Sequence, residues 1–112
     1  MTMTKKHKAL SLLGMAMRAG KLVTGDETVL KAVKQGKAKI VIVAADASDN
    51  TKKKFRDKCA TYNVKLLEAF DRITIGEAIG KSERVLLGVT DAGFSKSIEQ
   101  SLSEPSEVEY ID

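Results

Sequence analysis

Cysteine and histidine, which form disulfides, metal sites and many catalytic sites, are almost absent from this chain, with one of each among 112 residues. A disulfide needs two thiols, so Cys59 cannot form one within the chain, and this predicts a reducing compartment. His7 has no second histidine or nearby cysteine as a partner. Neither a zinc site nor a Ser-His triad is therefore expected.

Long apolar runs are also missing. No segment approaches the roughly 20 consecutive apolar residues of a membrane helix, so we expect no membrane association. Residues 9–20 are apolar and follow basic residues, as in a signal peptide. However, Ser11, Gly14 and Arg18 interrupt the run, and no clear cleavage site follows. We interpret this segment as the first helix of a cytoplasmic protein.

The net charge of +4 conceals an uneven distribution. Four of the 15 acidic residues lie in residues 103–112, which contain no base, so residues 1–102 carry +8. Pro105 and the lack of periodicity predict that 103–112 is a flexible acidic tail and that 1–102 form one domain. A basic domain favours an anionic partner, nucleic acid first. The alternative is a surface that carries many solvated lysines.

Apolar periodicity predicts helices that alternate with strands along the domain. The expected helices are residues 5–19, 24–36, 50–62, a short one opened by a Thr74-x-x-Glu77 capping box, and a last one capped by Asp91. The expected strands are residues 22–24, 40–45, 64–70 and 85–89. This alternation predicts an α/β fold, a three-layer α/β/α sandwich with a mixed four-stranded sheet.

Two details of the pattern can be checked directly. Strand 40–45 is a continuous apolar run without alternation, so both of its faces should be buried. Ser48 or Asp49 is expected to cap the helix 50–62, with Phe55, Cys59 and Tyr62 facing inward at helical spacing.

The chain is organised around residues 24–36, T-G-D-E-T-V-L-K-A-V-K-Q-G. The pattern predicts a loop that runs into a helix, with Thr24 or Asp26 as the cap and Gly36 as the end. A helix start offers free N–H groups and a positive dipole end, which suit a phosphate, and Lys31 and Lys34 can flank such a ligand. The alternative is a capped surface helix with solvated lysines.

Motifs of enzymes are absent. The chain has no phosphate loop, no G-x-G-x-x-G and no H-E-x-x-H. Asp46 and Asp91 follow strands, where a receiver domain would hold Mg²⁺, but each precedes a helix and is better explained as a cap. We therefore expect no catalytic residue, no metal site and no small-molecule cofactor.

Two segments resemble a known family. They are residues 12–48, L-L-G-M-A-M-R-A-G-K-L-V-T-G-D-E-T-V-L-K-A-V-K-Q-G-K-A-K-I-V-I-V-A-A-D-A-S, and residues 72–94, R-I-T-I-G-E-A-I-G-K-S-E-R-V-L-L-G-V-T-D-A-G-F. They resemble the small ribosomal proteins that bind kink-turn RNA: the archaeal large-subunit protein seven-A-e, the eukaryotic protein thirty-e and bacterial relatives of the YlxQ type. The resemblance covers roughly residues 10–98.

The resemblance implies an RNA-binding, ribosome-associated monomer. Its partner would be structured RNA with a kink-turn, a bulge flanked by tandem sheared G·A pairs, and ribosomal RNA is the first candidate. Two loops would contact the RNA, the second packing on an extruded base, with further lysines on the backbone. The implied contact residues are Gly25, Asp26, Glu27, Thr28 and Lys31 in the first region, Lys81, Ser82, Arg84 and Val85 in the second, and Lys21 and Lys34 at phosphates.

The first region departs from the family at two positions. Relatives often carry Asn or Lys followed by Glu or Gln where this chain has Glu27 and Thr28. The guanine of a sheared pair keeps its N1–H donor and O6 acceptor free, so Glu27 can accept from the first and Lys31 can donate to the second.

Two other functions stay open: a protein–protein adaptor in the translation machinery, and a non-catalytic RNA-positioning module of an RNA-modifying system.

Overall fold

Helices and strands alternate along the described part of the chain, as predicted. The computed structural model describes residues 5–103, and the predicted tail lies outside them from residue 104 onward. The elements are α1 (Lys5–Arg18), β1 (Leu22–Thr24), α2 (Asp26–Lys34), β2 (Ile40–Val43), α3 (Asp49–Thr61), β3 (Lys65–Glu68), α4 (Arg72–Ala78), β4 (Leu86–Val89) and α5 (Ala92–Ser103).

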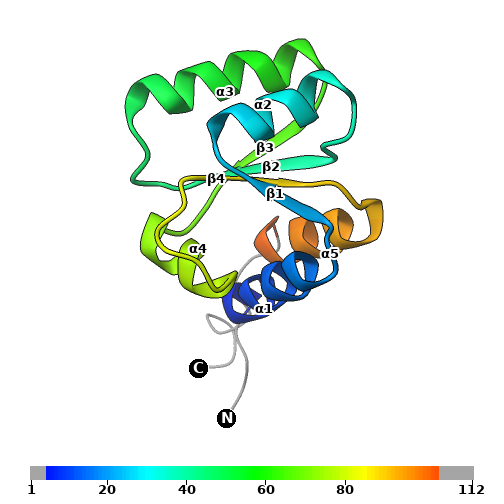
Figure 1. Ribbon diagram of the computed structural model, residues 1–112, viewed down its shortest axis with the longest axis vertical. Coiled ribbons are helices and arrows are strands. Elements are labelled where there is room, and N and C mark those ends of the chain that lie inside the picture. The colour runs from blue at the N-terminus through cyan, green and yellow to red at the C-terminus, as the bar shows by residue number, and fades with distance from the viewer. Residues whose placement is uncertain (1–4, 104–112) are drawn as a thin grey trace.

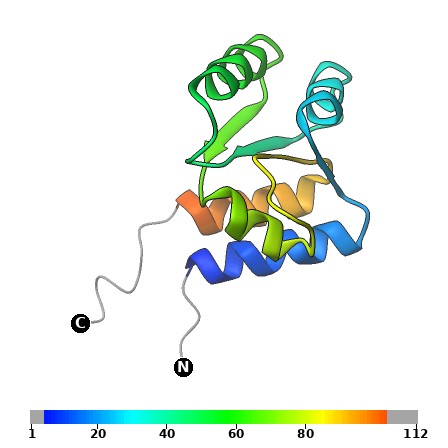
Figure 2. The ribbon, with the colours of Figure 1, turned by 60° about the vertical axis from the view of Figure 1, so that its left-hand side comes forward.

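The strands form one mixed sheet in the order β1-β4-β2-β3. β2 and β3 are parallel, whereas β4 is antiparallel to both of its neighbours, β1 and β2. α2 and α3 cover one face of the sheet, and α1, α4 and α5 cover the other (Figures 1 and 2). The three-layer α/β/α sandwich predicted from the sequence is therefore confirmed.

β2 is buried on both faces, as its continuous apolar run predicted. Ile40 and Ile42 belong to the core cluster that includes side chains of α1, α4 and α5. Val41 and Val43 point the other way and belong to the cluster with Phe55 of α3. Successive strand residues face opposite sides, so one short strand supplies both halves of the core.

Several predicted helix ends are confirmed. The Ser48 hydroxyl accepts the N–H of Thr51 at 3.1 Å and caps α3. The Asp91 carboxylate accepts an N–H in the first turn of α5 at 2.8 Å. Gly36 and Asn63 follow α2 and α3 with φ of 75° and 58°, the left-handed conformation that ends a helix.

Two local predictions are wrong. α4 begins at Arg72 rather than after a Thr74 capping box, because Asp71 is the cap and its carboxylate accepts the Thr74 N–H at 2.7 Å. This hydrogen bond holds the pKa of Asp71 below its ordinary value. Tyr62 is 43 % exposed rather than inward, since it lies at the C-cap where α3 has already ended.

Cys59 is a small core residue, as its place on the apolar face of α3 indicated. It is 1 % exposed and has no disulfide partner, and burial raises the pKa of its thiol. Over residues 5–103, no helix is both long and apolar enough to cross a membrane.

Candidate nucleic-acid interface

The two regions implicated in RNA binding meet at one end of the sheet. We call them the β1–α2 corner (residues 24–28) and the α4–β4 loop (residues 80–85). The Gly25 N–H points at the carbonyl of Leu86 at 3.4 Å, so the corner lies against the start of β4. The end of β2 is there too, since the Ala44 N–H donates to the Val85 carbonyl at 2.9 Å.

Three helices begin at this same end. β1, β2 and β3 run in one direction because β4 is antiparallel to both β1 and β2, and β3 is parallel to β2. Each of the three strands leads into a helix, so the starts of α2, α3 and α4 lie together on the left of Figure 1. Helix starts carry partial positive charge, which favours an anion. Ser48 and Asp71 already accept N–H groups of α3 and α4, whereas the start of α2 has no side-chain cap.

Gly25 shapes the β1–α2 corner. Its φ of 96° and ψ of 151° lie in a region that is essentially limited to glycine. The prediction that Thr24 or Asp26 caps α2 is wrong, because Gly25 is the N-cap and no side chain accepts there. The Asp26 carboxylate instead pairs with Lys54 of α3 at 2.7 Å. Thr28 is exposed, so the start of α2 is open to a ligand.

The outer face of α2 presents the predicted reading residues. Glu27, Lys31 and Lys34 are exposed at helical spacing. Together with Leu30 and Gln35 they line a surface depression of about 370 Å³. Within residues 5–103, neither Glu27 nor Lys31 forms an ion pair, so both keep their hydrogen-bonding capacity for a ligand.

The α4–β4 loop is held by its own side chains. Arg84 Nη1 donates to the Ser82 hydroxyl and to the Glu83 carbonyl, each at 2.9 Å. This folds the half-buried guanidinium back on the loop, whereas Lys81 and Ser82 are exposed. Val85 is half-buried beside both core clusters. In this arrangement Arg84 shapes the loop, and Lys81 carries the outward charge.

A network that the sequence did not reveal anchors this loop. The Asp46 carboxylate accepts the main-chain N–H of Arg72 at 3.0 Å and its Nε at 3.3 Å. Arg72 Nη1 lies 3.7 Å from the Glu83 carboxylate, and the Arg72 carbonyl accepts the Arg84 N–H at 3.0 Å. The prediction that Asp46 caps the helix after it is therefore wrong, since it holds the start of α4 instead.

Close packing against α4 further fixes the loop. A Cβ added to Gly76 would overlap the carbonyl oxygen of Ser82 and lie 2.7 Å from its carbonyl carbon. The loop main chain therefore passes directly over α4 at this residue. A side chain at this point would displace the whole loop, because both groups in contact are backbone.

Lys21 is the one implicated residue that lies elsewhere. Its carbonyl accepts the Thr90 N–H at 2.9 Å, just past the end of β4. It is therefore at the opposite end of the sheet from Gly25, although only three residues separate them. The described residues contain no cluster of three or more histidine, cysteine or acidic side chains that could hold a metal ion.

Residues 7–99 match the Ribosomal protein L7Ae/L30e/S12e/Gadd45 family. The chain belongs to this family. It is 47 % identical over 95 residues to the RNA-binding protein YlxQ of Enterococcus faecium, and this alignment covers 85 % of the chain and 91 % of the relative. The resemblance described from the sequence is thereby confirmed. The family and this relative are ribosomal and RNA-binding proteins rather than enzymes, in agreement with the lack of enzyme motifs.

Solved structures share the fold. A protein of unknown function from Bacillus halodurans is 48 % identical, with a TM-score of 0.85, and the match covers 87 % of this chain and 98 % of that one. The 15.5 kD RNA binding protein of Giardia lamblia has a TM-score of 0.74 over 96 % of this chain and 90 % of its own. At 20 % identity, the second likeness concerns the fold alone.

Proposed function

We propose that this protein binds RNA and recognises the kink-turn, a sharply bent duplex with tandem sheared G·A pairs. The observation that carries the proposal is the meeting of the β1–α2 corner with the α4–β4 loop. The two regions are more than 50 residues apart in sequence, yet the Gly25 N–H points at the Leu86 carbonyl. The name of the Enterococcus relative supports RNA as the ligand.

The exposed face of α2 supplies the chemistry. Glu27 accepts the guanine N1–H at a sheared pair, and Lys31 donates to O6. Lys34 and the start of α2 contact phosphates, and Val85 of the α4–β4 loop meets the extruded base. Shape recognition follows, because the bent RNA presents these groups together and the straight duplex does not.

A pair of RNAs tests this function. One carries the tandem G·A pairs, and the other has Watson–Crick pairs in their place but is otherwise identical. Calorimetry and gel shift should give tight binding to the first RNA only. Equal affinity for both RNAs would contradict kink-turn recognition and indicate nonspecific duplex binding.

Lys31→Ala tests the proposed reading residue. A contact to a base edge contributes about 1–3 kcal/mol, so affinity for the kink-turn should fall by roughly 5- to 150-fold. Lys96→Ala, at an exposed position on the opposite face of the sheet, is the matched control and should leave affinity unchanged. If the two variants bind alike, Lys31 is not in the interface.

We further propose that the protein acts as a cytoplasmic monomer on ribosomal RNA. The ribosomal family supports this assignment. Gradient sedimentation of cell extracts, with and without ribonuclease, tests it. Co-sedimentation with ribosomal subunits that ribonuclease abolishes is expected. Co-sedimentation that resists ribonuclease would favour a protein–protein adaptor.

A further inference from the structure

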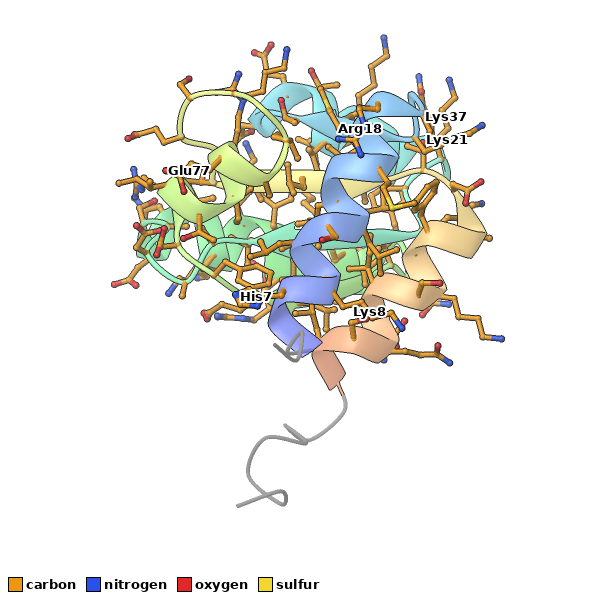
Figure 3. All side chains as sticks on the ribbon, turned by 90° about the horizontal axis from the view of Figure 1, so that it is seen from below. His7, Lys8, Arg18, Lys21, Lys37 and Glu77 are labelled. Atoms are coloured by element: carbon orange, nitrogen blue, oxygen red, sulfur yellow. The ribbon has the colours of Figure 1, made fainter. Side chains whose placement is uncertain are left out.

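A second basic surface lies at the end of the sheet opposite the β1–α2 corner. It consists of Lys21, Lys37 and Lys39, which we call the far-end lysines, and all three are exposed. In Figure 3 the labelled side chains of Lys21 and Lys37 project from the same side of the molecule. None of the three forms an ion pair or side-chain hydrogen bond with residues 5–103.

The sheet holds two of these lysines at a defined spacing. The Lys21 carbonyl accepts the Thr90 N–H at 2.9 Å, and the Lys39 N–H donates to the Val89 carbonyl at 2.8 Å. Lys21 and Lys39 thus flank the end of β4, one on each side. Their main chains are two strand spacings apart, about 10 Å. Both side chains point to the same face of the sheet, because both neighbours, Leu22 and Ile40, point into the opposite core cluster.

That face is the one covered by α2. Leu22 and Ile40 belong to the cluster that includes α1, α4 and α5, so Lys21 and Lys39 lie on the α2 side. Lys31 and Lys34 on α2 lead from the β1–α2 corner toward Lys37, which follows the end of the helix. Exposed lysines on α2 thus lie between the β1–α2 corner and the far-end lysines along the chain. Asp91, the acidic residue next to Thr90, does not pair with these lysines, because its carboxylate accepts an N–H of α5.

We infer that the far-end lysines bind the phosphate backbone of one duplex arm of the RNA held at the corner. The contact is to phosphates, so it is independent of sequence and sensitive to salt. From Lys39 to Ala44 the main chain of β2 extends about 16 Å. An arm must therefore reach at least that far beyond the G·A pairs to contact these lysines. The inference rests on the proposed function for the position of the RNA.

The test compares two double variants on three kinds of RNA. Lys21→Gln/Lys39→Gln removes the contact, and Lys8→Gln/Lys96→Gln removes the same charge from exposed positions on α1 and α5. The RNAs are a kink-turn with minimal arms, the same kink-turn with each arm extended in turn, and the extended RNA with Watson–Crick pairs replacing the G·A pairs. Urea unfolding midpoints should match the wild type for both variants.

We expect extension of one arm to tighten binding of the wild type and to make it more sensitive to salt. Lys21→Gln/Lys39→Gln should bind that RNA roughly tenfold more weakly at 100 mM salt. The slope of its log K against log salt should be less steep by about 2. Its affinity for the minimal RNA should not change. Equal losses in both double variants, or an equal loss on minimal and extended RNA, would overturn the inference. Failure of the proposed function has another signature: the Watson–Crick RNA would bind as tightly as the kink-turn, whichever protein is used.

Discussion

Gly25→Ala tests whether the backbone conformation of the β1–α2 corner matters, because the added methyl group changes that conformation without disturbing packing. Nothing lies within 4 Å of the position that an added Cβ would occupy, so the substitution causes no clash. Its effect comes from φ of 96° and ψ of 151°, which an L-residue occupies at a cost of about 1–3 kcal/mol. Set against a typical stability of about 5–15 kcal/mol, this loss is large enough to measure by urea unfolding.

Gly36→Ala is the matched control. Gly36 also has a positive φ, 75°, and also has no atom within 4 Å of an added Cβ, but it lies at the other end of α2. Its left-handed conformation costs an L-residue about 1–2 kcal/mol. We therefore expect both variants to be destabilised, and only Gly25→Ala to lose affinity for a kink-turn RNA with minimal arms, because relief of its strain moves the corner.

The two measurements together decide the matter. Urea titrations followed by circular dichroism give the free energies of unfolding, and calorimetry with the G·A-containing RNA gives the affinities. If Gly25→Ala is as stable as the wild type and binds as tightly, the glycine-specific conformation is not required. The corner would then be an ordinary helix start, and the structural basis of the proposed site would be lost.

Three further predictions concern the surroundings of the site. Gly76→Ala should lower the free energy of unfolding by at least about 1–3 kcal/mol in urea titrations, because its Cβ would overlap the main chain of Ser82. Asp71 has a lowered pKa in the folded state, so the stability it contributes is present above its unfolded pKa and is lost as pH falls through the folded value. Asp71→Asn keeps a good cap without titrating, so unfolding midpoints at pH 3–5 should depend less on pH than those of the wild type. Deletion of residues 104–112 removes four acids and should speed RNA association in stopped flow at low salt but not at high salt.

Periodicity in the sequence was sufficient to predict the layers of the fold. The run from Ile40 to Val43 is apolar at every position, and only an inner strand covered on both faces explains it. The order of strands was beyond such reasoning. The pairing of β4 with both β1 and β2 depends on contacts between residues such as Leu22 and Val89, which lie far apart in the chain.

Helix caps were predicted where the partner is local and missed where it is not. Ser48 caps the helix it precedes, and the sequence signal is three residues long. Asp46 has the same signal but holds Arg72, 26 residues away, and Asp26 pairs with Lys54 on another helix. A carboxylate beside a helix start has several possible partners, and tertiary packing selects among them.

In the candidate site, tertiary packing pairs most acidic side chains with bases. A phosphate-binding surface tolerates acidic residues only when their charge is compensated, since like charges repel. Asp26, Asp46 and Glu83 all lie at the end of the sheet where the RNA is proposed to bind. Asp26 pairs with Lys54, and Asp46 and Glu83 share Arg72. Among the acids of the two implicated regions, Glu27 alone is left unpaired within the described residues, and it is the acid to which we assign the guanine N1–H. On this argument Glu27→Gln, which keeps one acceptor oxygen but removes the charge, should weaken discrimination of the G·A pairs and strengthen nonspecific contact with phosphates, which calorimetry with the G·A and Watson–Crick RNAs measures.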